Sequence, residues 1–243
     1  MELRGKIALV TGAGHRLGQS IALALAEKGC DLVVHYHRAS EEASQTVKEI
    51  EGQGVRAQAV SADLSQAEGL ARLFRAVDEG CGGLDLLVNS AAVMRPAGLL
   101  TATEADWHQT IDLNLKAAFF CLQQAALRMR SRPEGGSIVN ISDLAGLRPW
   151  PRFPIHSISK AGVEMLTRVA ALALAPDIRV NAIAPGPVLK PETMSEARWQ
   201  AIGQGLPLHR PGSPSDVAQS VVFLFENDFI TGETLVVDGG NQL

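Results

Sequence analysis

The stretch PIHSISKAG, residues 154–162, places an imidazole and an ammonium group four residues apart. On a helix, the spacing between His156 and Lys160 puts both side chains on one face, about one turn apart. An imidazole exchanges protons near neutral pH, and a neighbouring ammonium group shifts the pKa of the acids and bases beside it. The spacing therefore predicts a proton-transfer pair, with two unrelated surface side chains as the alternative.

A glycine-rich turn, TGAGHRLGQS, follows the first apolar run of the chain. Gly12, Gly14 and Gly18 let the backbone turn sharply and approach a pyrophosphate, whose charge the N-terminus of the following helix stabilises. Because the turn stands after the first strand of an alternating chain, it predicts a dinucleotide-binding loop. A plain connection between strand and helix is the alternative.

The second apolar run ends in HYHRAS, residues 35–40. A dinucleotide fold that selects NAD places a carboxylate here, on the ribose 2′-hydroxyl. This chain instead offers Tyr36, His37 and Arg38, with Arg16 in the glycine-rich turn nearby. A guanidinium fork and an imidazole attract a 2′-phosphate, so we predict NADP as the cofactor, with solvated surface charges as the alternative.

Short apolar runs alternate with amphipathic segments along the chain. The predicted strands are 6–11, 31–36, 55–60, 84–89, 136–141, 178–184 and 233–238. The predicted helices are 16–28, 40–52, 65–79, 103–131, 155–175 and 214–226. This alternation predicts an α/β chain: a single-domain doubly wound Rossmann fold over residues 1–243, with a parallel sheet of about seven strands and helices on both faces. The Gly- and Pro-rich segment 186–213 is expected to be a mobile substrate flap.

Composition narrows the possible partners. The net charge of −4 argues against nucleic acid and anionic membrane surfaces, and no apolar run approaches the ~20 residues of a membrane span. Cys30, Cys81 and Cys121 are isolated, which predicts buried or half-buried thiols in a reducing compartment, and the six histidines are too scattered for a metal site. We therefore expect a cytoplasmic protein that acts on a small molecule.

In this order and spacing, the motifs resemble those of the short-chain dehydrogenase/reductase family, over essentially the whole chain. TGAGHRLG matches the glycine turn of that family except at Arg16, which replaces its middle glycine, and VNSAA (88–92) is similar to its NNAG segment, with Ser90 and Ala92 altered. Further matches are ADLS (62–65), DLNL (112–115), NAIAPGPV (181–188) and ITGETLVVDGG (230–240).

The resemblance implies a set of cofactor contacts. They are Gly12, His15, Arg16, Leu17, Gly18, Tyr36, His37, Arg38, Asp63, Leu64, Asn89, Ser90, Ala91, Lys160, Pro185, Gly186 and Val188. Within the family, three features resemble the pteridine reductases: Arg16, the HYHR run, and an aspartate where most members have the catalytic serine. The resemblance thus implies that the run after the second strand binds the 2′-phosphate of NADPH.

The catalytic signature departs from that of the family, which has a serine, a tyrosine thirteen residues later, and a lysine after four more. Counting back from Lys160 gives His156 in place of the tyrosine and Asp143 in place of the serine, and the only tyrosine of the chain is Tyr36. The active-site asparagine of the family corresponds to Asn114. The usual phenolic proton donor is therefore missing.

Three interpretations follow from this departure. In the first, Asp143, His156 and Lys160 form a rebuilt proton-transfer site, with Asn114 holding a water that joins Lys160 to solvent, and the chain is an NADPH-dependent reductase. In the second, it is an NADP(H)-binding protein with impaired or no reductase activity, a regulatory pseudoenzyme. In the third, it is a variant inactivated by an introduced tyrosine-to-histidine change.

The substrate half of the resemblance is weaker than the cofactor half. Pteridine reductases carry an aromatic ring just after the NNAG segment, whereas this chain has Val93 and Met94 there. Trp150 is the ring available to stack on a flat substrate. The expected apolar cleft is lined by Met94, Leu144, Trp150, Phe153 and Leu189. The prediction is a pteridine or small carbonyl substrate, with a 3-oxoacyl thioester or small ketone remaining open.

Helices 103–131 and 155–175 carry more apolar surface than one sheet contact uses. The side chains in question are Phe119, Phe120, Leu122, Val163, Leu166 and Val169. The family resemblance implies that these helices pack into a dimer and then a homotetramer.

Overall fold

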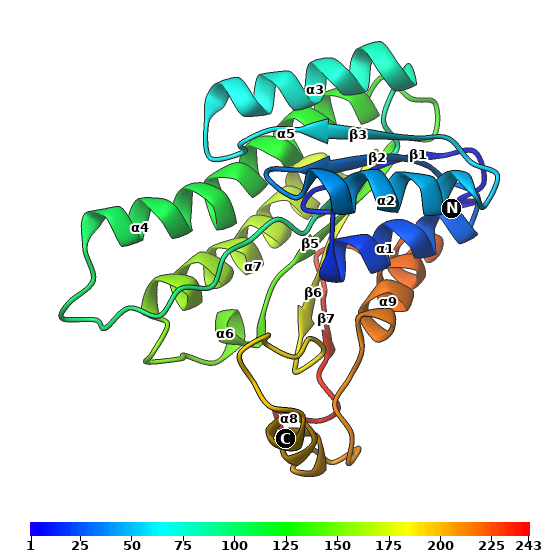
Figure 1. The fold of residues 1–243 in the computed structure, drawn as a ribbon. Coiled ribbons are helices and arrows are strands. Elements are labelled where there is room, and N and C mark those ends of the chain that lie inside the picture. The colour runs from blue at the N-terminus through cyan, green and yellow to red at the C-terminus, as the bar shows by residue number, and fades with distance from the viewer.

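In the computed structural model, which describes residues 1–243, the strands form one parallel seven-stranded sheet (Figure 1). The strand order is β3-β2-β1-β4-β5-β6-β7. Strands β2 and β3 therefore extend the sheet on one side of β1, and strands β4 to β7 extend it on the other side, so the order reverses between β1 and β4. The strands are β1 (Ile7–Val10), β2 (Asp31–Tyr36), β3 (Ala57–Ser61), β4 (Leu86–Asn89), β5 (Gly136–Ile141), β6 (Ile178–Pro185) and β7 (Thr234–Val237). The predicted doubly wound fold is confirmed.

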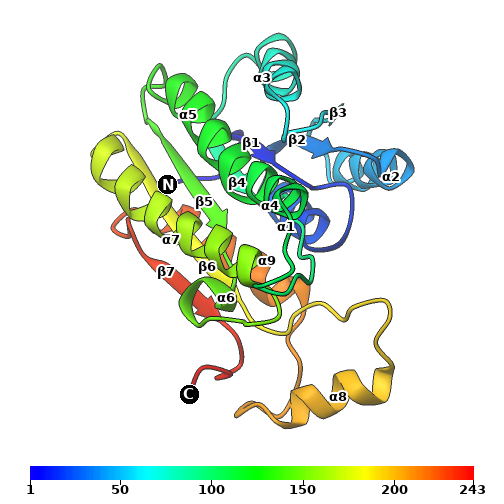
Figure 2. The same cartoon turned by 90° about the vertical axis from the view of Figure 1, so that its left-hand side faces the viewer.

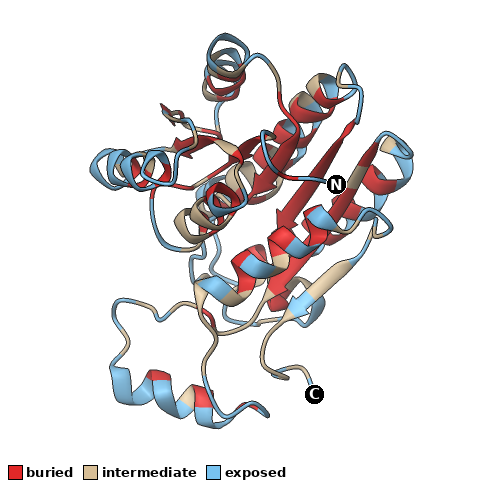
Figure 3. Ribbon diagram, turned by 90° about the vertical axis from the view of Figure 1, so that its right-hand side faces the viewer, coloured by how far each residue is buried: buried red, intermediate tan, exposed pale blue.

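Helices cover both faces of the sheet, and apolar side chains of strands and helices meet in two core layers (Figure 3). One face carries α1 (Arg16–Glu27), α2 (Ser40–Glu51) and α9 (Pro214–Glu226). The other carries α3 (Ala67–Cys81), α5 (Ala117–Met129) and α7 (Pro154–Leu174). Strands β1, β4 and β5 are buried along their whole length, because helices lie on both sides of them.

The helix predicted over 103–131 is interrupted, which corrects that expectation. Helix α4 (Glu104–Ile111) leads into a π-helical turn, η1 (Asp112–Lys116), and α5 then continues to Met129. The interruption centres on Asn114. The side chain of Asn114 is hydrogen-bonded to the backbone of Val93, and the main chain at this residue is π-helical instead of α-helical. Such π-turns are frequent at functional sites.

Segment 186–213 contains a short helix, α8 (Glu196–Gln204), which the sequence did not suggest. Figure 2 shows this helix projecting from the body of the molecule on two connecting arms. The base of the segment is closed by a hydrogen bond from the amide of Gly212 to the carbonyl oxygen of Pro187, 3.0 Å long. Its mobility stays a prediction. A second short helix, α6 (Leu144–Leu147), follows β5.

The apolar side chains expected to cover a subunit interface fall into two groups. Leu122, Val163 and Leu166 are buried against the sheet of their own chain, which corrects the expectation for those three. All three are buried residues of α5 and α7, and Leu122 and Leu166 belong to the core layer beneath these helices. The other three remain exposed: Phe119, Phe120 and Val169.

The structure contains no helix with the length and apolar character that a membrane span requires.

Candidate active site

The glycine-rich turn joins β1 to α1 at the point where the strand order reverses, which is where open α/β sheets bind ligands. The amide N–H groups of residues 14–18 donate no hydrogen bond within the chain. They lie at the N-terminus of α1, whose dipole favours an anion. Gly18 has no room for a side chain, because a Cβ atom there would lie 2.2 Å from the carbonyl oxygen of Gly12. Free amides and a glycine-lined cradle fit a pyrophosphate group.

Arg16 has a positive φ of 57°, a left-handed backbone conformation that favours glycine. It is the residue that replaces the middle glycine of the family turn, so the backbone has kept the conformation of a glycine while acquiring a guanidinium group. Because L-residues are strained there, the side chain is placed at a cost in stability.

Thr11, which the sequence analysis did not single out, ties the glycine-rich turn to the segment after β4. Its hydroxyl oxygen accepts hydrogen bonds from the amides of Ser90 (2.9 Å) and Ala91 (3.0 Å). Gly12 packs on the same segment, since a Cβ atom on it would lie 3.0 Å from the Cα of Ala91. The feature of the sequence that could have identified Thr11 is its position directly after β1 and before Gly12.

The residues expected at a 2′-phosphate lie at the ends of β2 and β3. Arg38 is exposed, Tyr36 is half-buried, and the imidazole Nε2 of His37 lies 4.0 Å from a carboxylate oxygen of Asp63. The other carboxylate oxygen of Asp63 accepts hydrogen bonds from the amide and hydroxyl of Ser65. Leu64 is buried beneath this edge. His37, Arg38 and Asp63 thus share one rim, with two cationic or titratable groups beside a single carboxylate.

Helix α7 carries both members of the pair that began the sequence analysis. Pro154 stands at its first turn, where a missing N–H is harmless, and His156 and Lys160 both face the interior, 3% and 5% exposed. The ammonium Nζ of Lys160 donates to the carbonyl oxygen of Ile141 at 2.7 Å. Burial lowers the pKa of Lys160 to about 8, although the nearby carboxylates of Asp143 and Glu164 raise it in part.

Asp143 and His156 face each other across the start of α6. One carboxylate oxygen of Asp143, Oδ1, accepts a hydrogen bond from the amide of Ala145 and caps α6, while Oδ2 lies 3.4 Å from Nε2 of His156. That contact lacks hydrogen-bond geometry, so Nε2 is buried without a hydrogen-bond partner. The Asp143 side chain is 23% exposed, whereas that of His156 is 3% exposed, so the carboxylate is the more accessible member.

Asn114 lies beside this pair and is held firmly. Its side-chain carbonyl accepts from the amide of Val93 at 2.8 Å, and its amide nitrogen donates to the carbonyl of Val93 at 2.9 Å and to the hydroxyl of Ser159 at 3.1 Å. Nδ1 of His156 lies 3.4 Å from the same amide nitrogen and 3.3 Å from the carbonyl oxygen of Val93. The four residues predicted to be catalytic therefore lie around one point at the carboxyl end of the sheet.

Other predicted cofactor residues differ in what their side chains do. The amide nitrogen of Asn89 donates to Asn140 and to the carbonyl of Ala118, so this side chain is taken up by contacts within the protein. Gly186 packs on β7, since a Cβ atom there would lie 2.6 Å from Asp238, and its carbonyl accepts from the amide of Val188. His15 and Leu17 flank Arg16 at the start of α1, and Pro185 ends β6.

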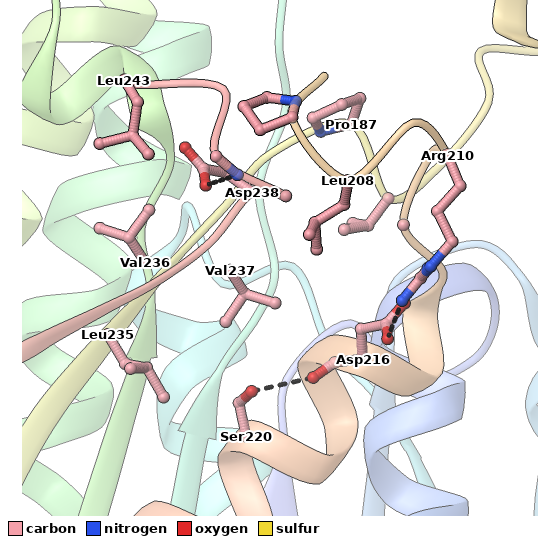
Figure 4. Close-up of a pocket in the computed structure, with 15 residues that line it drawn as sticks. Pro187, Leu208, Arg210, Asp216, Ser220, Leu235, Val236, Val237, Asp238 and Leu243 are labelled. Atoms are coloured by element: carbon pink, nitrogen blue, oxygen red, sulfur yellow. Dashed lines mark hydrogen bonds and ion pairs between the residues drawn. The ribbon is translucent and has the colours of Figure 1, made fainter. Parts of the chain in front are cut away.

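A cavity of about 470 Å³ lies beside Val188 and away from Asn114, Asp143, His156 and Lys160 (Figure 4). It opens between the base of segment 186–213, the start of α9 and the end of β7, beside the ion pair of Arg210 and Asp216. Of the predicted site residues, only Val188 lines it. The chemistry-bearing groups therefore lie outside this cavity.

Comparisons with known proteins cover almost the whole chain. The sequence profile of the family described as enoyl-(acyl carrier protein) reductase matches residues 12–242. The 3-oxoacyl-(acyl-carrier-protein) reductase FabG of Staphylococcus aureus is 39% identical over 241 residues, covering 97% of both chains. The 2-dehydro-3-deoxy-D-gluconate 5-dehydrogenase of Escherichia coli is 38% identical over 247 residues, covering 98% of this chain and 96% of its own.

Solved structures agree as well. A putative short-chain alcohol dehydrogenase from Sinorhizobium meliloti superimposes with a TM-score of 0.92 at 38% identity, covering 99% of this chain and 98% of the other. Acetoin dehydrogenase YohF from Salmonella typhimurium gives 0.90 at 33% identity, covering 98% and 97%. With the dinucleotide turn, the lysine on α7 and the asparagine in the π-turn in place, the chain belongs to the short-chain dehydrogenase/reductase family, whose members are oxidoreductases that use a nicotinamide cofactor.

Proposed function

We propose that the chain is an NADPH-dependent reductase of a pteridine or small carbonyl compound, in which Asp143 and His156 together replace the usual serine and tyrosine. The observation that carries this proposal is the 3.4 Å approach of the Asp143 carboxylate to the imidazole of His156, one helical turn from Lys160. A carboxyl group at this point, with the imidazole packed behind it, supplies a proton donor to a site that lacks the phenol.

The choice of NADPH over NADH rests on charge. Arg16 stands at the start of α1, His37 and Arg38 directly follow β2, and the carboxylate that faces His37, that of Asp63, is already hydrogen-bonded to Ser65. A phosphate on the ribose would gain charge-assisted hydrogen bonds from the guanidinium groups. NADH would leave those cations without a partner.

In the proposed reduction, the cofactor supplies the hydride and the protein supplies the proton. When bound, the nicotinamide supplies the hydride. Asp143 is the more exposed member of the pair, so it contacts the substrate, and its carboxyl O–H bond breaks as the new bond to hydrogen forms on the substrate. Asp143, which is 23% exposed, then regains its proton from solvent, and His156, buried behind Oδ2, keeps the carboxyl group in position. Lys160, held by the carbonyl of Ile141 and still charged at pH 7, stabilises negative charge that develops at the reacting centre.

The substrate class follows from the cleft and from the relatives. Met94 is 50% exposed, and Trp150 and Phe153 are half-buried with their ring centres 6.2 Å apart. Leu144 is buried, so it does not offer the exposed surface that a lining residue of the expected cleft needs. These rings favour a flat compound such as a pteridine, whereas the two relatives are named for activity on an acyl and a sugar-acid compound. A small carbonyl compound is common to both arguments.

A second candidate is an NADP(H)-binding protein without turnover. It is favoured by the burial of His156, whose Nε2 has no hydrogen-bond partner and no exposed surface. An imidazole in that position cannot deliver a proton directly to a ligand in the cleft. The two candidates differ in whether Asp143 carries the proton.

The deciding experiment combines cofactor titration with single-turnover rates on dihydrobiopterin, a folate and an acetoacetyl thioester. We expect Asp143→Asn to lower the rate of reduction by about 100-fold or more, because it removes the donor, while the Kd of NADPH stays unchanged. We expect His156→Ala to lower the rate less, because it loosens the position of the Asp143 carboxyl group without removing the donor.

The matched control is the double variant Asp143→Ser with His156→Tyr, which rebuilds the ordinary signature of the family. Reduction by the double variant together with none by the unmodified chain identifies the binding protein without turnover. Tight NADH binding with weak NADPH binding overturns the choice of cofactor.

A further inference from the structure

His35 is a buried imidazole that the mechanism above does not use. It lies on β2 and is 2% exposed, next to the two neighbouring strand ends that carry the glycine-rich turn and Asp63. The amide of Gly12 donates to its Nδ1 at 3.0 Å, and its Nε2 lies 3.0 Å from the carbonyl oxygen of Ala62. One ring therefore joins the end of β1 to the end of β3.

These two contacts determine the tautomer of the ring. A carbonyl oxygen only accepts hydrogen bonds, so Nε2 carries the hydrogen, and Nδ1 must be bare to accept from Gly12. Burial lowers the pKa of His35 to about 4, with His37 and Asp63 as the charged neighbours, so the ring is neutral at physiological pH. The donor and the acceptor are thus both available in one fixed arrangement.

The contact to Gly12 completes the set of bonds that hold the turn. The amide of Thr11 donates to Val88 on β4, and the amide of Ala13 donates to the backbone carbonyl of His35. Between them, Gly12 has φ of 69° and its amide has no backbone acceptor, so only the imidazole satisfies it. The free amides that fit a pyrophosphate begin two residues later, and their direction depends on how this anchored part is held.

We propose that His35 is a positioning residue for the dinucleotide, which holds the pyrophosphate turn and the adenine-side segment at a fixed separation through its Nε2–H tautomer. Ala62 directly precedes Asp63, so the ring spans the parts of the chain that meet the two halves of the adenosine diphosphate group. This inference rests on the cofactor of the proposed function but not on its turnover. Because the pyrophosphate is common to NADPH and NADH, His35 acts on both alike.

The test separates the two hydrogen bonds of the ring. In His35→Asn, the amide oxygen takes the position of Nδ1 and can accept from Gly12. In His35→Gln, the amide nitrogen takes the position of Nε2 and can donate to Ala62, and His35→Leu keeps neither. The matched control is Val33→Ala, on the same strand and the same face two residues earlier, which opens a cavity without touching the turn.

We expect His35→Leu to raise the Kd of NADPH and of NADH by the same factor, about tenfold, because an orphaned Gly12 amide lets the turn relax. His35→Asn should recover affinity to within about threefold, His35→Gln should not, and Val33→Ala should melt earlier with an unchanged Kd. In the unmodified chain, ¹⁵N histidine shifts should show a bare Nδ1 and a protonated Nε2, and hydrogen exchange at Gly12 should accelerate in the Leu and Gln variants only.

Three results would overturn the proposal. They are an unchanged Kd in a folded His35→Leu variant, an equal loss of affinity in Val33→Ala, and an Nδ1–H tautomer. An unmodified chain that binds neither nucleotide overturns this proposal together with the cofactor assignment. A chain that binds NADPH with the expected His35 dependence but reduces no substrate overturns the proposed reductase alone.

Discussion

At the scale of single residues, the backbone conformation of Arg16 lowers the stability of the fold, whereas its side chain, in the proposed function, strengthens cofactor binding. Its φ of 57° is a conformation in which an L-residue costs roughly 1–2 kcal/mol relative to glycine. A strained residue persists when something else in the site benefits from it. For Arg16 we attribute that benefit to its guanidinium group, which in the proposed function binds the 2′-phosphate together with Arg38.

We therefore expect Arg16→Gly to raise the free energy of unfolding by about 1 kcal/mol and to weaken NADPH binding by about tenfold, with NADH binding unchanged. Urea denaturation and cofactor titration measure the two effects. Arg38→Asp is the control, since it should shift preference toward NADH without any gain in stability. If Arg16→Gly leaves the ratio of the two Kd values unaltered, the guanidinium does not bind the 2′-phosphate.

Lys160 gives a pH-dependent prediction with a definite sign. Burial lowers its pKa from 10.5 in the unfolded chain to about 8, so between these values the unfolded chain binds more protons and stability rises with pH. Below about pH 8 the full penalty applies, roughly 2–4 kcal/mol at 1.36 kcal/mol per pH unit, and above pH 10.5 it is gone.

Lys160→Met should therefore raise the free energy of unfolding at pH 7, and the difference from the unmodified chain should shrink steadily from pH 8 toward pH 10.5. Denaturant unfolding at a series of pH values measures it. A difference that is constant across this range would show that the pKa of the lysine is not depressed. The same substitution removes the ammonium group from the proposed site, so reduction should be lost as stability rises.

At the scale of elements, the π-turn η1 and the segment after β4 depend on one another through Asn114. The Asn114 side chain satisfies both the amide and the carbonyl of Val93, and it comes from the turn that interrupts two helices. Without those bonds, the backbone of Val93 at the floor of the site would have to find water instead.

We expect Asn114→Ala to lower the free energy of unfolding by about 2 kcal/mol and to speed hydrogen exchange at the Val93 amide. Asn114→Asp is the comparison, because it keeps the acceptor for that amide and should retain its protection. Equal exchange rates in both variants and in the unmodified chain would mean that the Val93 backbone is held by other contacts.

The elements themselves were largely predictable from sequence, with each strand placed within two residues of its observed limits. Short apolar runs between amphipathic segments leave little freedom in a buried parallel sheet. The π-turn at Asn114 could not be predicted, because the bond that creates it reaches Val93, twenty-one residues away. Helix α8 was missed because its residues are mostly exposed and show no marked apolar face.

Sequence spacing supplied the residue types of the candidate site, whose roles stay predictions, but not their geometry. Counting spacings brought Asp143, His156 and Lys160 together, since a family signature is a statement about sequence distance. It did not reveal that the imidazole lies behind the carboxylate, or that Thr11 and His35 tie the turn to its neighbours. Those facts depend on which rotamer the packing allows.

At the scale of the whole molecule, α5 and α7 present apolar side chains that their own chain does not cover. Phe119, Phe120 and Val169 are 46%, 40% and 55% exposed, and the two phenyl rings pack edge to face with centres 5.2 Å apart. Exposed apolar side chains gathered on adjacent helices favour contact with another protein surface. We propose a second copy of this chain as the partner and a homotetramer as the assembly.

We expect Phe119→Glu combined with Val169→Glu to convert the tetramer to a smaller species, because charges on both helices would have to be buried in the interface. Sedimentation velocity measures the change. Leu100→Glu is the control, since Leu100 is 98% exposed on a loop outside α5 and α7. An unmodified chain that sediments as a monomer would contradict the proposal.

The cap that Asp143 places on α6 bears on how this site could have arisen. Serine and aspartate are among the best residues at a helix N-cap and are nearly interchangeable there, so an exchange at position 143 leaves the first turn of α6 supported. During evolution, serine could thus be replaced by aspartate at position 143, or aspartate by serine, without an intermediate protein in which α6 is destabilised. The fold leaves this position free to explore new chemistry, whereas Gly18, with no space for even one added carbon, cannot change at all.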